Sequence, residues 1–250
     1  MSRYGRGTVA GFSLGGGWTP GVKALVMTCG IAFVLQIFEQ LTGSGAITRE
    51  FGLTPAMVTQ QFFLWQLVTY IFLHGNFMHI LFNMFALYMF GSELEVVWGR
   101  RQFLKYFFIC GIGAALATIL VRPHDLIPTI GASGAIFGVL LAYGILFPDR
   151  PIYLYMIVPI PAKWFVIIIG AFTFYSSLSD LGIGPASGSN VAYLAHLGGL
   201  VVGFVYLRGG RIFKIRGMYD RWKRDRARRK FDVHYNERRQ NEKDNRFRRW

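Results

Sequence analysis

Six long apolar blocks with few charged residues divide this chain, and they constrain its fold more than any other feature of the sequence. A hydrocarbon layer about 30 Å thick is crossed by roughly 20 apolar residues of helix. A soluble domain of 250 residues would show polar residues at helical or strand spacing throughout. We therefore expect an all-α polytopic membrane protein with six transmembrane helices, near residues 22–41, 77–97, 103–121, 133–147, 162–178 and 191–207.

Gaps that contain Gly, Pro or charged residues separate the blocks and indicate three regions. Residues 1–21 are Gly-rich and are expected to be a flexible leader, residues 22–207 form the six-helix core, and residues 208–250 are a basic tail. A long leader followed by five more apolar blocks favours an uncleaved first span over a signal peptide. Residues 42–73 are too amphipathic for a simple loop and predict short helices at the membrane interface.

The distribution of Lys and Arg predicts the orientation of the chain. Six spans put both termini on one side of the membrane, and the loops of the opposite side contain only Arg49 and Arg122. Because cytoplasmic loops are enriched in Lys and Arg, we expect both termini in the cytoplasm. Besides the tail, the basic residues on that side are Arg3, Arg6, Lys23, Arg100, Arg101, Arg150 and Lys163.

The basic tail carries much of the net charge of +14, with 17 Lys and Arg against 6 Asp and Glu between residues 208 and 250. Next to a span, such a tail is expected to bind anionic lipid. No RNA-binding motif is recognisable, so no nucleic acid is expected as a partner. Cys29 and Cys110 lie in apolar blocks without a second ligand at metal-binding spacing, so we expect no disulfide framework, metal or cofactor.

The fourth block is short and begins with a serine in an unusual setting. Residues 133–147 would form a helix roughly 22 Å long, too short to cross the hydrocarbon alone. Ser133 lies in the segment GASG, inside an uncharged run from residue 129 to 147. Irregular backbone at membrane depth persists only where it lines a cavity or is enclosed by protein. We therefore expect Ser133 at a helix N-terminus beside a wet cavity, as a candidate nucleophile; a small-residue helix contact is the alternative.

A serine hydroxyl needs a base to accept its proton, and His196 in the sixth block is the best placed histidine. Burying an ionisable residue within a span costs free energy, so such a residue indicates function. The alternative is a core histidine that is hydrogen-bonded to another helix. Small residues beside both side chains would let the two helices approach closely. They are Gly134 and Gly138 near the serine, and Ala195, Gly199 and Gly203 near the histidine.

The second block opens with HGNFMHILFN, which places His79 and Asn83 on one helix face. Together with the backbone N–H of Ser133 at a helix N-terminus, these donors could stabilise a developing oxyanion. Hydrogen bonds to neighbouring helices or loop carbonyls are the alternative role for both side chains. His74 is expected in the turn that leads into this helix.

No carboxylate is positioned to complete a triad, so the residues predict a Ser–His dyad. The imidazole would then be oriented by packing. Phe137 lies one turn after Ser133 on the same face, where its ring could stack on the histidine. Ordinary core packing is the alternative for Phe137.

Three motifs of this sequence resemble those of the rhomboid family of intramembrane serine proteases. They are HGNFMH with Asn83, then GASG, and then Ala195-His196 beside a stripe of small residues. The three motifs occur in the family's order, on the second, fourth and sixth of six blocks. The resemblance covers residues 22–207. It implies that Ser133 is the nucleophile and His196 the general base and acid.

The resemblance also implies supporting roles. His79 and Asn83 match the oxyanion-stabilising pair, with Gly131 and Ser133 shaping the backbone part of that hole. His74 matches a histidine that supports the loop above the site. Residues 42–73 resemble the family's lateral interfacial loop, and residues 180–190 the loop that caps the site. Two positions depart from common family residues: Gln66 stands where Arg is frequent, and Phe137 where Tyr is frequent.

The expected activity is hydrolysis of transmembrane protein substrates near the outer end of their spans, in a cavity open to the outer side. Small residues at the cleavage site and helix-weakening Gly or Pro nearby are expected in the substrate. A catalytically inactive relative that escorts membrane proteins is one alternative, and a transporter with broken helices is another. The resemblance suggests a bacterial inner membrane, and the sequence makes no prediction of the oligomeric state.

Overall fold

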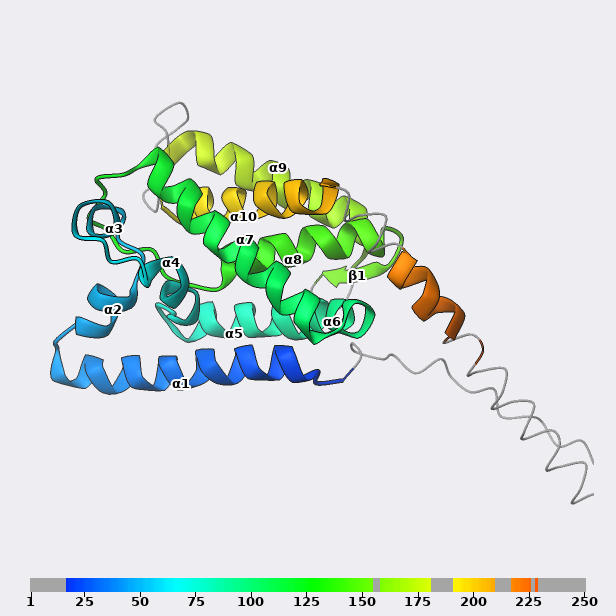
Figure 1. Ribbon diagram of the computed structural model, residues 1–250, viewed down its shortest axis with the longest axis horizontal. Helices are drawn as coiled ribbons and strands as arrows, with labels where there is room; N and C mark the ends of the chain where they lie inside the picture. The colour runs from blue at the N-terminus through cyan, green and yellow to red at the C-terminus, as the bar shows by residue number, and fades with distance from the viewer. Residues whose placement is uncertain (1–16, 155–157, 181–190, 210–216, 226–227, 229–250) are drawn as a thin grey trace, which may run out of the picture. The chain divides into compact units, whose positions relative to one another are not determined.

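The computed structural model describes residues 17–154, 158–180, 191–209, 217–225 and 228, and shows a helical protein with one small hairpin (Figure 1). The chain divides into two compact units, Met1–Tyr206 and Leu207–Trp250. Most of the predicted leader, the segment at residues 181–190 and most of the basic tail lie outside the described residues.

Three helical segments are long and apolar enough to cross a membrane, namely Pro20–Leu41, Phe77–Trp98 and Arg100–Val121. The first segment is α1 (Pro20–Thr42) and the third is α7 (Arg100–Val121). The second is a continuous run of α5 (Phe77–Ala86), a π-helical turn (Leu87–Gly91) and α6 (Ser92–Trp98).

Three shorter apolar helices follow: α8 (Ser133–Leu146), α9 (Ala162–Asp180) and α10 (Val191–Arg208). All six helices occur where the sequence predicts spans, although the predicted second span is interrupted by the π-helical turn. The short helix α8 contacts α5, α6, α7 and α9, so the segment that begins with Ser133 lies among the other helices (Figure 1).

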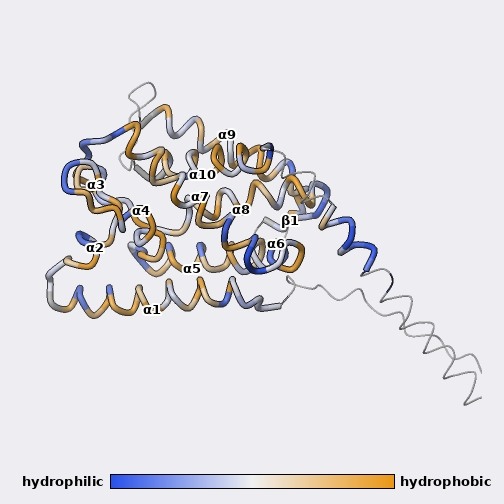
Figure 2. Tube along the Cα trace, viewed as in Figure 1, coloured by the Kyte–Doolittle hydropathy of each residue, from blue (hydrophilic) through white to orange (hydrophobic). Residues whose placement is uncertain are grey.

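The outer faces of the helices are apolar, as expected for contact with lipid. Large exposed hydrophobic side chains lie along α1, α5 and α9, among them Phe38, Phe82 and Phe172. Hydrophobic residues recur along these helices in Figure 2. Together with the long apolar helices, this identifies the chain as an integral membrane protein.

A buried carboxylate holds the start of α1. Pro20 begins the helix, a position where its missing N–H costs nothing. Glu95 on α6, which is 4% exposed, accepts hydrogen bonds from the backbone N–H groups of Gly21 (2.7 Å) and Val22 (2.8 Å). The hydroxyl of Thr19 donates to the same carboxylate at 2.6 Å. Glu95 therefore caps α1 from another helix and joins the first and second predicted spans.

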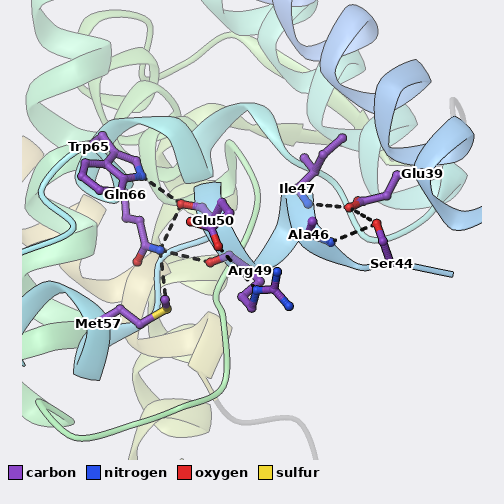
Figure 3. Close-up of polar contacts among 9 residues, drawn as sticks. All are labelled: Glu39, Ser44, Ala46, Ile47, Arg49, Glu50, Met57, Trp65 and Gln66. Atoms are coloured by element: carbon purple, nitrogen blue, oxygen red, sulfur yellow. Dashed lines mark hydrogen bonds and ion pairs between the residues drawn. The ribbon is translucent and has the colours of Figure 1, made fainter. Parts of the chain in front are cut away.

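The connection between α1 and α5 consists of the predicted short helices: α2 (Ala46–Phe51), α3 (Pro55–Gln61), α4 (Gln66–Thr69) and a 3-10 turn at Tyr70–Phe72. Figure 3 shows the polar contacts that order its first half. The carboxylate of Glu39 accepts from Ser44 Oγ (2.9 Å) and from the N–H of Ile47 (2.6 Å) in the first turn of α2.

Gln66 is fully buried and ties the connection together (Figure 3). Its Nε2 donates to the carbonyls of Arg49 and Glu50, both at 3.2 Å, and its Oε1 accepts from the N–H of Thr54 at 2.9 Å. Trp65 Nε1 donates to the carbonyl of Glu50 at 2.9 Å. A neutral amide thus satisfies the backbone groups here, so the departure from arginine leaves the loop ordered.

A two-stranded antiparallel hairpin, β1 (Pro151–Leu154) and β2 (Val158–Pro161), joins α8 to α9. The prediction of an all-α protein is wrong in this detail. The segment is rich in β-branched, aromatic and proline residues, which favour extended backbone, but it lies in a gap between two apolar blocks where no span was expected.

In the second unit, residues 217–225 are helical. The rings of Tyr219 and Trp222 stack with their centroids 5.8 Å apart, one turn apart on the same side of this helix. Part of the basic tail is therefore helical.

Candidate active site

Ser133 is the first residue of α8, as the sequence predicts. Gly131, two residues before it, has φ of +125°, a conformation that L-residues other than glycine rarely adopt. This glycine turns the chain out of the loop, and Ala132 already has helical angles at the N-cap. The hydroxyl of Ser133 therefore lies at the positive end of a helix, where the first N–H groups have no partner within the helix.

The structure brings Ser133 and His196 together from α8 and α10. Ser133 Oγ lies 2.7 Å from His196 Nε2, a hydrogen-bond distance. The imidazole stacks on Phe137 with centroids 4.3 Å apart and an interplanar angle of 7°. The ring of Tyr193 meets it at 90°, 6.2 Å away. Sequence reasoning missed Tyr193, although its position one turn before His196 was a usable signal.

The two helices approach closely because their contact is made of small residues. A Cβ at Gly199 would overlap the carbonyl oxygen of Gly134, and one at Gly138 would lie 3.3 Å from the carbonyl oxygen of Gly199. A Cβ at Gly203 would lie 3.3 Å from the Cα of Gly138, and one at Gly134 would lie 3.3 Å from the carbonyl oxygen of Ala195. All five predicted packing residues therefore lie at this contact.

His79 faces the serine from the other side of Gly131. Its Nδ1 accepts a hydrogen bond from the N–H of Gly75 at 3.3 Å, which assigns the ring hydrogen to Nε2. A Cβ on Gly131 would lie 2.7 Å from His79 Nε2 and 3.7 Å from Ser133 Oγ. The histidine N–H and the serine hydroxyl therefore border one small space, which stays open because residue 131 is a glycine.

The N–H of Gly131 is already bonded elsewhere. It donates to the carbonyl oxygen of Tyr70 at 2.9 Å, and the hydroxyl of Tyr70 donates to the carbonyl of Gly111 on α7 at 2.7 Å. Leu53 and Thr129 exchange two further backbone hydrogen bonds, of 2.9 and 2.8 Å. The connection at residues 42–73 thus holds the loop in front of Ser133, and Gly131 contributes space and shape instead of a donor.

Asn83 is buried one turn after His79 on α5. Its Nδ2 donates to the carbonyl oxygen of His79 at 2.9 Å, which occupies one of the two amide hydrogens. Among the described residues, no hydrogen bond joins Asn83 to Ser133. The structure therefore places Asn83 beside His79, bonded to its backbone.

His74 lies in the turn before α5 and is 1% exposed. Its N–H donates to Gln36 Oε1 at 3.0 Å, its Nδ1 lies 3.2 Å from the carbonyl of Phe72, and its ring contacts the edge of His79 with centroids 5.0 Å apart. Burial and, to a smaller extent, the charge of His79 lower the pKa of His74 to about 4, against the opposing effect of the Phe72 carbonyl. His74 is therefore neutral and supports the position of His79.

Within the described part of the chain, no group of three or more His, Cys, Asp or Glu side chains could hold a metal ion. The chemistry that the site offers is that of a hydroxyl, a neutral imidazole hydrogen-bonded to it, and nearby N–H donors.

These features define a helical integral membrane protein in which a serine–imidazole pair lies at the start of a short, central helix. The Rhomboid domain family model matches residues 61–211, and the chain therefore belongs to the rhomboid family. This agrees with the resemblance of the three motifs.

Curated proteins from bacteria, fungi and plants are similar to this chain. Rhomboid protease GluP of Bacillus subtilis is 33% identical over 172 residues, which cover 69% of this chain and 31% of the relative. Rhomboid protein 1, mitochondrial, of Saccharomyces cerevisiae is 32% identical over 139 residues, covering 54% and 38%. RHOMBOID-like protein 1 of Arabidopsis thaliana is 32% identical over 182 residues, covering 72% and 42%. The chain thus spans less than half the length of each of these relatives.

Proposed function

We propose that this protein is an intramembrane serine endopeptidase that hydrolyses peptide bonds in or near the outer end of substrate transmembrane segments. The observation that carries the proposal is the 2.7 Å contact between Ser133 Oγ and His196 Nε2. Membership of a family whose relatives include proteins named as proteases supports it.

In the proposed mechanism, His196 Nε2 accepts the proton of Ser133 as Oγ attacks the scissile carbonyl carbon. The tetrahedral intermediate collapses when the imidazolium gives that proton to the leaving amine, which leaves an acyl-enzyme on Ser133. A water molecule then loses a proton to His196 and attacks the ester carbonyl. The second intermediate releases the carboxyl product as Oγ regains its proton.

The oxyanion is proposed to lie in the space beside Gly131. His79 Nε2–H and the N–H of Ser133 donate to it, helped by the positive end of α8. Asn83 is proposed as a further donor through its remaining amide hydrogen, and its bond to the His79 carbonyl keeps the two donors on one face of α5. Because no carboxylate completes a triad among the described residues, Phe137 orients the imidazole by stacking.

The proposed topology has six spans with both termini in the cytoplasm and the site open to the outer side, in a bacterial inner membrane. The 14 residues of α8 make a helix roughly 21 Å long, so Ser133 starts below the outer surface. The basic tail is proposed to bind anionic lipid, because 17 Lys and Arg at residues 208–250 would lie next to the last span.

The proposed substrates are transmembrane proteins whose helix unwinds locally. A helical amide is shielded and hydrogen-bonded, so a scissile carbonyl must leave the helix to reach Ser133. The proposed oxyanion space beside Gly131 is narrow and is bordered by His79 and Ser133, so the carbonyl that enters it is expected to belong to a residue with a small side chain.

The testing experiment is cleavage of a tagged single-span reporter with Gly and Ala in its outer segment, in reconstituted vesicles. The wild type should cut, and Ser133→Ala and His196→Ala should not. Ser177→Ala is the matched control, because Ser177 is a buried serine whose hydroxyl donates to a carbonyl of its own helix, that of Thr173. His124→Ala controls for loss of a histidine outside the site.

Equal cleavage by the wild type and both site variants would mean that another nucleophile acts, and would refute the assignment. If none of the proteins cuts, a fluorophosphonate probe decides: labelling of the wild type but not of Ser133→Ala shows an active nucleophile. Absence of labelling in a folded wild type would instead favour the inactive escort protein.

A further inference from the structure

The hairpin between α8 and α9 is an apolar element that no step of the proposed reaction uses. No charged residue occurs between Arg150 and Lys163, a run too short to cross a bilayer. The charges at its base are paired: Arg150 with Glu93 of α6, and Lys163 with Asp149 at 2.8 Å. The two strands therefore contain no charged residue, and the charged residues at their base are paired.

Both faces of the hairpin are apolar. In the register Tyr153↔Pro159 and Ile152↔Ile160, the first pair lies on one face and the second on the other. A hairpin with one face in water alternates apolar and polar side chains, and this alternation is missing here. Tyr153 is 42% exposed and Val158 is 54% exposed. Hydrophobic side chains are thus presented on both sides of the element.

Prolines occupy three of the four described positions whose N–H groups would point outward from the two strands. Pro159 and Pro161 of β2 have no N–H, so the hydrogen-bonded pairs of the ladder are those of Ile160 and Val158. Pro151 lies at an outward position of β1, where Tyr153 has the remaining outward N–H. The β2 edge therefore has no donor at these positions to pair with another strand, and the hairpin leaves few backbone donors unsatisfied in an apolar environment.

The hairpin continues into a lipid-facing helix surface. β2 ends at Pro161 and α9 begins at Ala162. Trp164 (53% exposed), Ile167 and Ile168 then follow on the exposed side of α9. Tyr and Trp are enriched at the boundary between lipid headgroups and acyl chains, and Tyr153 and Trp164 flank the junction of hairpin and helix.

We propose that the β1–β2 hairpin lies in the headgroup–acyl boundary of the bilayer and binds lipid with both faces, anchoring the end of α9 where it enters the membrane. The occupant is the lipid surface because both faces are apolar, the hairpin is continuous with the exposed apolar side of α9, and the prolines of β2 oppose pairing with another strand. This inference concerns the membrane contact of the hairpin and does not depend on protease activity.

The test measures the surroundings of a nitroxide spin label on the hairpin. Val158→Cys and Tyr153→Cys are made singly in the full-length protein and reconstituted in phosphatidylethanolamine–phosphatidylglycerol vesicles. Collision rates with oxygen, which concentrates in lipid, and with a nickel chelate, which stays in water, are then compared. Both native cysteines are buried, and the wild-type protein measures their background labelling.

Two matched positions calibrate the result: Ile168→Cys on the exposed face of α9 for lipid, and Asp149→Cys at the exposed base of the hairpin for water. Labels at 158 and 153 should show an oxygen-to-nickel ratio clearly above that of position 149 and no higher than that of position 168, because position 168 lies six residues further along α9 and deeper in the bilayer. A ratio like that of position 149 would place the hairpin in water and overturn the proposal. Exclusion of both reagents would indicate a protein contact and would overturn it equally. Using two positions on opposite faces guards against one variant that fails to fold.

Discussion

A single methyl group added at Gly131 is expected to disable the enzyme by displacing His79. In Gly131→Ala, the new carbon would lie 2.7 Å from His79 Nε2, whereas nonbonded heavy atoms settle roughly 3.5 Å apart. The imidazole must therefore move by about 1 Å. Alanine must also adopt φ near +125°, at a cost of about 1–3 kcal/mol.

The expected effect on catalysis follows from the loss of one oxyanion donor. Such a loss costs roughly 3–4 kcal/mol of transition-state stabilisation, so kcat should fall about 100- to 1000-fold with little change in KM. The assay is the initial rate of reporter cleavage over a range of substrate concentrations. Gly75→Ala is the matched control, because its methyl group would contact the same ring at an ordinary 3.9 Å from Nδ1.

A double-mutant cycle separates this mechanism from general destabilisation. If Gly131→Ala acts by moving His79, it should reduce kcat little further in a His79→Ala background. Multiplication of the two effects would refute the reasoning, and so would a Gly131→Ala variant with wild-type kcat. Thermal unfolding in detergent checks that each variant is folded under the assay conditions.

Three further perturbations address other parts of the structure. His74 has a folded-state pKa of about 4, below the ordinary 6.5 of the unfolded chain, so the unfolded state binds the proton first as pH falls. The free energy of unfolding should therefore decrease as pH drops from 6.5 towards 4, by at most about 3 kcal/mol. In His74→Phe, the midpoint of thermal unfolding should depend less on pH over this range. Glu95→Gln should lower the midpoint of thermal unfolding, because an amide cannot accept all three hydrogen bonds at the start of α1; an unchanged midpoint would contradict the capping role. Phe137→Leu should reduce kcat roughly 2- to 10-fold because it removes the aromatic ring that stacks on His196, whereas Phe137→Tyr should retain activity. Equal rates for the wild type and both variants would show that the stack does not orient the imidazole.

The helices could be predicted from the sequence because lipid imposes a simple rule. A helix in contact with lipid needs a long apolar run, and the six runs mark all six apolar helices. The start of α8 could be predicted for a similar reason, since the short run beginning at Ser133 leaves little freedom for where the helix begins. The small residues from Gly134 to Gly203 predicted the close contact of two particular helices.

Other features could not be predicted because they depend on contacts between distant residues. The capping of α1 by Glu95 joins positions more than 70 residues apart, and the buried Gln66 satisfies carbonyls from another short helix. The sequence could not show whether Gly131 contributes an N–H donor or only space. The structure distinguishes the two roles, because the N–H of Gly131 already donates to the carbonyl of Tyr70. The hairpin was missed because a search for spans treats residues 151–161 as a gap.

The absence of a side chain at Gly131 organises the site as much as any side chain does. Three separate segments meet at this position: His79 from α5, Ser133 from α8, and the Tyr70 carbonyl from the connection after α1. Each is fixed by its own contacts, so the space proposed for the oxyanion is already formed without substrate. Within the described residues no carboxylate orients His196, and Phe137 and Tyr193 enclose the imidazole on two sides instead. Because ring packing carries no charge, it fixes the geometry of the base without burying an additional ion inside the membrane.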